Sequence, residues 1–158
     1  MKTLWLLLAG TALLLPTLSL GGDKMEEITR DKILATGSQW QQKYDQYRPA
    51  QDMLEALKSK LGENVRIEVY LGTWCPDSRN NVPAFIKILD LLETRVSVRY
   101  FDVPRKPSKD VRYYVEDLKV ERVPTFIFYR DGKEIGRIVE NPKAGMIEDM
   151  MDVLFRES

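Results

Sequence analysis

The chain has 158 residues, 44% of them hydrophobic, and its 24 basic and 24 acidic residues give a formal net charge of zero. This length suits one globular domain with a buried core, and the balanced charge excludes a polycationic nucleic-acid-binding protein. With no histidine and one cysteine, Cys75, the chain excludes histidine-dependent catalysis, cysteine-based zinc sites and internal disulfides.

The first 21 residues have the layout of a secretory signal peptide. Lys2 precedes an apolar run over residues 4–15, which is followed by the helix breaker Pro16 and by small residues. The run is shorter than the about 20 apolar residues that span a bilayer, although an uncleaved anchor has a similar layout. We therefore expect an exported protein, periplasmic or extracellular, that meets a membrane only through this segment.

Residues 22–49 form a polar N-terminal extension, expected to be helical around residues 28–34 and 40–47. We expect aromatic residues of this extension to pack against a domain spanning residues 50–158. A helix with Pro49 in its first position is expected where the extension joins this domain. Apolar residues follow at helical spacing until Gly62, namely Met53, Leu54, Leu57 and Leu61.

A strand and a helix come next. Residues 65–71 are rich in β-branched and aromatic side chains, as in a strand, and Cys75-Pro76 then opens a helix. Pro83 lies inside this helix and should kink it. The apolar face of the helix is formed by Val82, Phe85, Ile86 and Leu89.

The second half of the chain alternates in the same way. Residues 96–101 read as a strand, and Ser108 caps a predicted helix. The apolar face of that helix is formed by Val111, Tyr114 and Leu118. Strands over 125–129 and 134–139 flank an Asp-Gly turn and predict a hairpin.

The predicted final helix starts at Asn141-Pro142 and has a buried stripe of Met146, Met150, Val153 and Leu154. The resulting order of elements indicates an α/β fold. A partly parallel sheet is expected, with helices on both faces and an antiparallel closing hairpin.

Cys75 is predicted at the N-cap of its helix, with Pro76 in the first helical position. There a thiolate faces the free N–H groups of Asp77 and Ser78 and the positive end of the helix dipole, which stabilise the anion relative to the thiol. The Ser78 hydroxyl can add a hydrogen bond. The Asp77 carboxylate opposes ionisation and Arg79 offsets it. The alternative is a small buried hydrophobic side chain.

Two motifs carry a resemblance to a known family. Trp74-Cys75-Pro76-Asp77-Ser78 resembles the Trp-Cys-x-x-Cys loop of the thioredoxin fold, with Ser78 in place of the second cysteine. Val123-Pro124-Thr125 resembles the family's Val-Pro-Thr segment, whose cis-proline faces the active cysteine. The resemblance covers about residues 50–155 and looks most like exported bacterial members. It implies a thioredoxin-like fold in which Cys75 reacts and Trp74, Pro76 and the Val123-Pro124-Thr125 segment contact substrate.

This sequence departs from the family at three positions. Ser78 cannot resolve a mixed disulfide, so Cys75 needs an external thiol for release. The family's buried acid corresponds to Val69, with Glu68 beside it as a candidate proton carrier. A glycine late in the family's final strand is replaced near Glu140, which affects the usual substrate groove.

These features predict monothiol thiol–disulfide exchange or isomerase-like chemistry, with protein or small-molecule thiols and disulfides as partners. No metal, cofactor or nucleic acid is expected, and two chains joined through Cys75 are one possible assembly. The alternative is a non-catalytic thioredoxin-fold module that holds an extended peptide. Iron–sulfur carriage and peroxidase activity are remote, because neither loop pattern is reproduced around Cys75.

Overall fold

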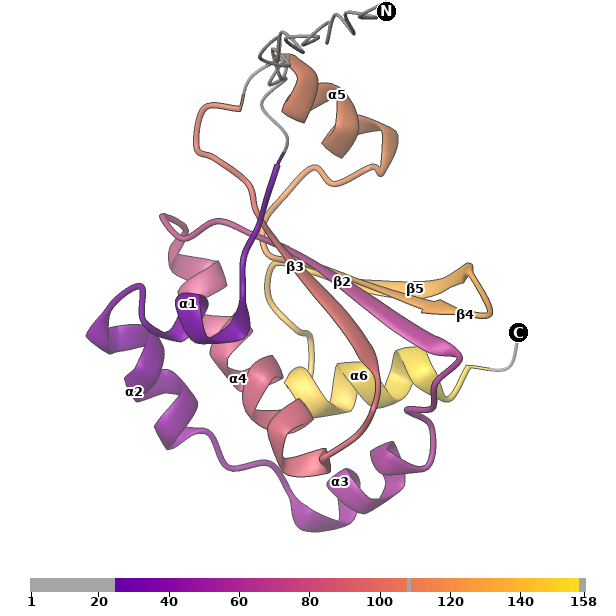
Figure 1. The fold of residues 1–158 in the computed structure, drawn as a ribbon. Helices are drawn as coiled ribbons and strands as arrows, with labels where there is room; N and C mark the ends of the chain where they lie inside the picture. The colour runs from indigo at the N-terminus through magenta and orange to yellow at the C-terminus, as the bar shows by residue number, and fades with distance from the viewer. Residues whose placement is uncertain (1–24, 108, 157–158) are drawn as a thin grey trace, which may run out of the picture.

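A computed structural model describes residues 25–107 and 109–156. Within these residues, five strands form one mixed sheet in the order β1-β3-β2-β4-β5 (Figure 1). β2 and β3 are parallel, and the other neighbouring pairs are antiparallel. The strands are β1 (Glu26–Glu27), β2 (Val65–Leu71), β3 (Ser97–Asp102), β4 (Thr125–Arg130) and β5 (Lys133–Val139). The predicted α/β class, thioredoxin-like with a mixed sheet flanked by helices, is confirmed.

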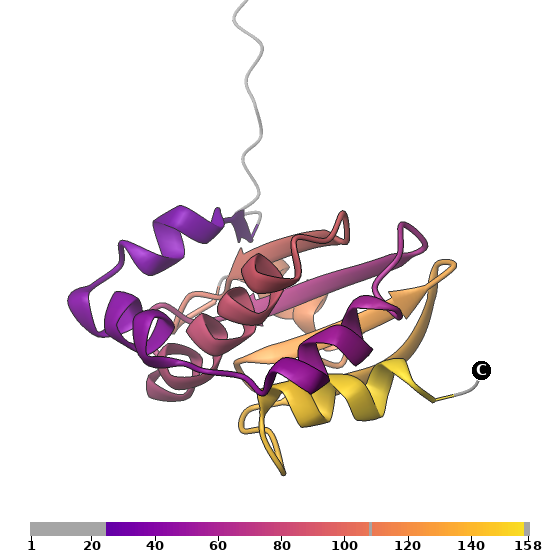
Figure 2. The same cartoon turned by 90° about the horizontal axis from the view of Figure 1, so that it is seen from below.

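Helices cover the two faces of the sheet unequally. The helices are α1 (Arg30–Leu34), α2 (Ser38–Gln46), α3 (Gln51–Lys58), α4 (Pro76–Leu92), α5 (Lys109–Asp117) and α6 (Met146–Leu154). Figure 2 shows α3, α4 and α6 side by side on one face, with α1 and α2 outside α4. α5 lies on the opposite side, near one end of the sheet (Figure 1).

The alternation of side chains along β2 separates two apolar clusters. Ile67 and Val69 are fully buried in the main core, beneath α3, α4 and α6. Tyr70 points to the other face and belongs to the smaller cluster near α5. That cluster consists of Tyr70, Phe101, Val103, Val115, Val120 and Ile127. Its valines recur in the groove described below.

Residues of the N-terminal extension belong to the main core. Trp40 is 3% exposed and packs there. The Arg30 guanidinium of α1 donates to both carboxylate oxygens of Asp90 in α4. The Tyr44 hydroxyl donates to the same carboxylate at 2.7 Å, so α1 and α2 are fastened to the helix that begins at Cys75.

Two helix starts differ from the predictions. α3 begins at Gln51, two residues after Pro49, because Ala50 has the extended backbone of an N-cap. α6 begins at Met146 rather than at the Asn141-Pro142 pair. There the Asp149 carboxylate accepts the N–H groups of residues 143 and 144 and holds the preceding segment as a loop.

The remaining predictions concern the proline within α4, the signal peptide and the helix after Ser108. α4 continues from Pro76 to Leu92 with Pro83 inside it. The predicted signal peptide, Ser108 and the side chains of Val111 and Tyr114 lie outside the described residues. In the described part, no helix has the length and apolar character needed to cross a membrane.

Candidate functional site

Cys75 occupies the N-cap of α4, at the end of the loop that follows β2. Its backbone is extended, with φ −88° and ψ 126°, and Pro76 is the first helical residue. The Cys75 carbonyl accepts the N–H of Arg79 at 3.1 Å, and the Cys75 N–H donates to Gly72 O at 2.8 Å. These bonds hold the residue at the helix mouth, as the position of Pro76 predicts.

The sulfur makes a different contact from the expected one. Cys75 Sγ donates to the carbonyl of Val123 at 3.3 Å, and the side chain is 7% exposed. It makes no cap hydrogen bond to the first amides of α4, so the expected bonds from Asp77 and Ser78 are absent in this geometry. A thiolate has no proton to donate, so ionisation removes the bond to Val123.

The second motif meets the first through this bond. The Val123-Pro124 peptide bond is cis, as the resemblance implied. Pro124 is buried, and Thr125 is 1% exposed, with its hydroxyl donating to Arg122 O at 2.6 Å. The Thr125 side chain therefore fixes the loop in front of the thiol.

Ser78 lies one turn into α4 but does not face the groove beside Cys75. Its side chain is fully buried, and its hydroxyl accepts the N–H of Gly72 at 3.1 Å. This bond ties the first turn of α4 to the end of the loop after β2. Ser78 therefore has a structural partner in the position where the resemblance places a second thiol.

Trp74 lies next to the Cys75 thiol and lines the same groove. Its indole N–H donates to Val103 O at 2.9 Å, and its side chain is 43% exposed. Asp102 fixes the preceding residue, because its two oxygens accept the N–H of Thr73 at 3.0 Å and the Thr73 hydroxyl at 2.9 Å. Asp102 is a positioning residue that the sequence motifs do not reveal.

A groove of about 390 Å³ opens next to Cys75. Its lining combines the two motifs with residues near the ends of β3 and β5 and around α5. The lining residues are Trp74, Cys75, Asp77, Val103, Pro104, Arg105, Pro107, Val115, Val120, Glu121, Arg122, Val123 and Glu140. Its valines and prolines give an apolar lining beside charged groups, so the groove can receive a peptide segment.

Charged side chains stand around this apolar lining. The Arg105 guanidinium carbon lies 5.6 Å from the centre of the Trp74 ring. Arg122 pairs with Glu140 at 2.7 Å. Asp77, one of the predicted modulating residues, lines the groove with these groups, whereas Pro76 and Arg79 do not.

Glu68 belongs to another cluster. It is 6% exposed, pairs with Arg66 and accepts the Tyr70 hydroxyl at 2.9 Å. Val69, the position of the family's buried acid, is fully buried in the main core. Glu68 does not line the groove of Cys75, and these bonds give its carboxylate a structural role on the sheet.

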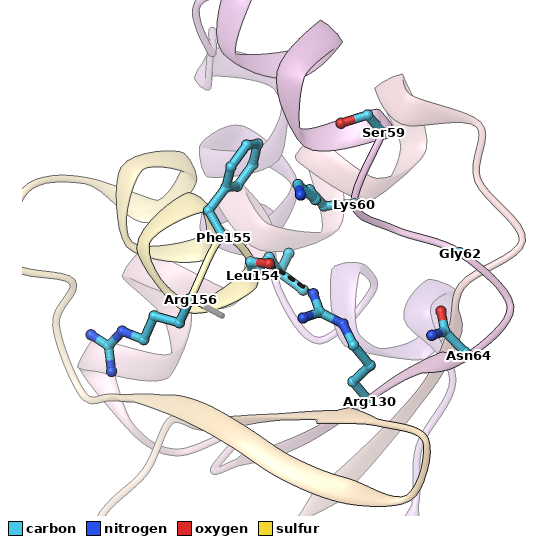
Figure 3. A pocket seen from close by; sticks show the side chains of 8 residues that line it. All are labelled: Ser59, Lys60, Gly62, Asn64, Arg130, Leu154, Phe155 and Arg156. Atoms are coloured by element: carbon cyan, nitrogen blue, oxygen red, sulfur yellow. Dashed lines mark hydrogen bonds between the residues drawn. The ribbon is translucent and has the colours of Figure 1, made fainter. Parts of the chain in front are cut away.

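A second pocket, of about 330 Å³, lies beside the turn that joins β4 to β5 (Figure 3). Arg130 donates to the carbonyl of Leu154 at 2.7 Å, and Lys60 lies 4.8 Å from the centre of the Phe155 ring. Arg156 pairs with Asp152 and points away from the cavity in Figure 3. Arg130 and Lys60 thus lie at the C-terminal end of α6, where positive charge stabilises a helix. The residues of this pocket therefore have a structural role.

Comparison with known sequences gives a consistent family. A family model described as thioredoxin matches residues 22–154. Thioredoxin H3 of Arabidopsis thaliana is 29% identical over 101 residues, which cover 63% of this chain and 80% of that protein. The chloroplastic thioredoxin Y1 of the same plant is 31% identical over 86 residues. That match covers 54% of this chain and spans less than half of the relative, 46% of its length.

Solved structures show the same fold. A protein of unknown function from Pseudomonas aeruginosa has a TM-score of 0.57 and 16% identity. The match covers 83% of this chain and 92% of that one. At this identity, the likeness concerns the fold alone.

Proposed function

Since this chain belongs to the thioredoxin family, we propose that it catalyses thiol–disulfide exchange with Cys75 as its single nucleophile. The observation that carries the proposal is the meeting of the Cys75 thiol with Val123 at the edge of a groove. A sulfur at a helix N-terminus beside a groove that can receive a peptide has the two parts that such a reaction requires.

The reaction proceeds in two exchanges. The Cys75 thiolate attacks one sulfur of a substrate disulfide, a new S–S bond forms, and the other substrate sulfur leaves as a thiolate. An external thiol or a second substrate cysteine then attacks the mixed disulfide and regenerates Cys75. Each exchange conserves the number of disulfides, so no separate oxidant is needed.

Val123 supplies the binding part of the proposal. Its carbonyl holds the Cys75 proton at rest, and ionisation of the thiol frees this acceptor for a substrate N–H. An extended substrate segment would then lie between Trp74 and Val123, with apolar groove residues beneath it. Protein disulfides and thiols outside the cytoplasm are the proposed substrates, in keeping with the predicted signal peptide.

The test is capture of a mixed disulfide. Purified chain, reduced and then mixed with a peptide whose cysteine carries a thionitrobenzoate leaving group, should release the coloured thiolate in proportion to Cys75. Mass spectrometry should find the peptide on Cys75, and Cys75→Ser should abolish both signals. If Cys75 is alkylated no faster than free cysteine, its proposed role as the nucleophile is wrong.

The competing function is a binding module that uses the groove without chemistry. Trp74 and Val123 would then hold a peptide while Cys75 served packing, as its 7% exposure allows. Partner capture separates the two: equal capture by wild type and Cys75→Ala supports binding alone, whereas loss in Cys75→Ala supports exchange.

A further inference from the structure

Glu140 holds an unusual backbone conformation at the rim of the groove. Its φ is +58°, in the left-handed region that residues other than glycine rarely adopt. The Glu140 N–H donates to Pro124 O at 2.7 Å, and its carbonyl accepts the Asn81 side chain at 3.1 Å. Two elements therefore fix this residue beside the Val123-Pro124 segment.

The Glu140 side chain reaches back across the same segment. Its carboxylate pairs with Arg122, the residue before Val123, at 2.7 Å. The Glu140 backbone is bonded to Pro124, the residue after Val123. The ion pair and this backbone bond thus tie Glu140 to both chain neighbours of Val123, and all three of Arg122, Val123 and Glu140 line the groove.

We propose that the Arg122–Glu140 ion pair is a specificity gate that an extended substrate must open to pair with Val123. The inference rests on the proposed exchange at Cys75. A small disulfide reaches the sulfur without lying along Val123, so the gate does not select against it. A peptide segment that pairs with the Val123 backbone has to displace the side chain of Arg122 or of Glu140. The gate therefore slows long substrates relative to small ones.

The exposure of the pair sets the size of the effect. The Arg122 and Glu140 side chains are 64% and 33% exposed, and an exposed ion pair shifts an equilibrium by up to about fivefold. Such a pair weakens with salt, since the Debye length falls to about 3 Å at 1 M. The gate therefore has a signature in salt dependence as well as in mutation.

The experiment compares two probes that release the same thionitrobenzoate from the same Cys75 attack. One is a short uncharged peptide with a central activated cysteine, and the other is activated mercaptoethanol. The quantity measured is the ratio of the peptide rate to the mercaptoethanol rate. Glu140→Ala and Arg122→Ala should each raise this ratio about two- to fivefold, because either change removes the pair. The double variant should gain no more than either single one.

Glu93→Ala is the matched control. Glu93 is also a glutamate with positive φ, +50°, but it is exposed at the far end of α4 and does not line the groove. It should leave the ratio unchanged, so a general effect of truncating a glutamate at positive φ is separated from loss of the gate. In wild type, raising the salt to about 1 M should raise the ratio, and in Glu140→Ala it should not.

The outcomes distinguish the gate from the exchange reaction. Additive gains in the double variant, or an unchanged ratio in both single variants while both probes still react at Cys75, would overturn the gate and leave the exchange intact. Absence of any Cys75-dependent release with either probe would overturn both. Matching gains in the two single variants that disappear at high salt would support the gate.

Discussion

The thiol of Cys75 donates to the main-chain carbonyl of Val123 at 3.3 Å, although 48 positions separate the two residues in the chain. β2 and β4 are hydrogen-bonded neighbours in the sheet. The loop that leaves β2 and the loop that enters β4 therefore meet at one end of the sheet. The contact between the Cys75 thiol and the Val123 carbonyl thus follows from the order of the strands.

Introducing a second thiol at position 78 should change how the mixed disulfide is released. In Ser78→Cys the new thiol lies one helical turn from Cys75, so attack on the mixed disulfide becomes intramolecular. Peptide release should become independent of external thiol, whereas wild type should require it in proportion to its concentration. Release from a purified Cys75–peptide disulfide, followed by mass spectrometry, measures this difference.

Removing the Ser78 hydroxyl should affect stability more than chemistry. Ser78→Ala leaves the Gly72 N–H without its acceptor in a buried position, which costs about 1–3 kcal/mol. Chemical denaturation measures the loss. Ser97→Ala, at an exposed strand position, should stay within about 0.5 kcal/mol of wild type. Equal effects of the two substitutions would contradict a structural role for the Ser78 hydroxyl.

Gly72→Ala should displace the ring of Trp74, which lines the groove beside Cys75. A methyl group at residue 72 would lie 2.8 Å from the Trp74 ring, which is held by its bond to Val103. We expect a shifted indole N–H resonance, a cost of about 1–3 kcal/mol and slower reaction with the peptide probe.

Gly37→Ala is the control for this substitution, because a methyl group there meets no atom within 4 Å. It should leave the Trp74 resonance and the peptide rate unchanged. A normal Trp74 resonance in Gly72→Ala would show that the ring accommodates the methyl group.

Truncating Trp40 should destabilise the whole chain. Trp40 is 3% exposed in the main core, and losing a buried tryptophan costs about 3–5 kcal/mol. Because this core also includes β2 and α4, we expect a single unfolding transition at lower denaturant. Leu91→Ala, at a side chain 46% exposed, is the control and should change stability little. A separate early transition in Trp40→Ala would mean that the extension unfolds independently.

High pH should weaken the fold through Tyr129. Burial, followed by the charge of Glu68, raises the pKa of Tyr129 from 10.0 to about 12. Between these values the folded chain retains a proton that the unfolded chain has lost, so stability falls as pH rises. Tyr129→Phe should reduce the slope of unfolding free energy against pH in this window. An unchanged slope would contradict the assignment, and phenolate absorbance provides a second measurement.

The sequence predicts most of the elements closely because their signals are local. The β-branched run gives β2 with its observed bounds, and Cys75-Pro76 gives the start of α4. The Asp131-Gly132 turn has positive φ at both positions, as its sequence indicates. The predicted start of α6 was wrong because it depends on the Asp149 carboxylate. That carboxylate lies six residues beyond the first amide it binds.

The candidate site was less accessible to prediction than the fold. Cys75 and Val123 come from motifs, but the sulfur bonds a carbonyl instead of helix amides, which depends on the distant loop. Arg105 and Arg122 enter the groove only through tertiary structure. Arg122 stands directly before the Val-Pro-Thr segment, and that adjacency was the one available signal.

β1 is two residues long, yet it changes what the sheet offers to other molecules. By pairing with residues 101 and 102 it occupies part of the outer edge of β3, where a strand from another chain could otherwise add. The opposite edge, β5, carries Lys133, Glu134 and Arg137, charges that discourage such addition. With β1 on one edge and these charges on the other, the sheet leaves little unpaired, uncharged edge on which a strand of a second chain could add.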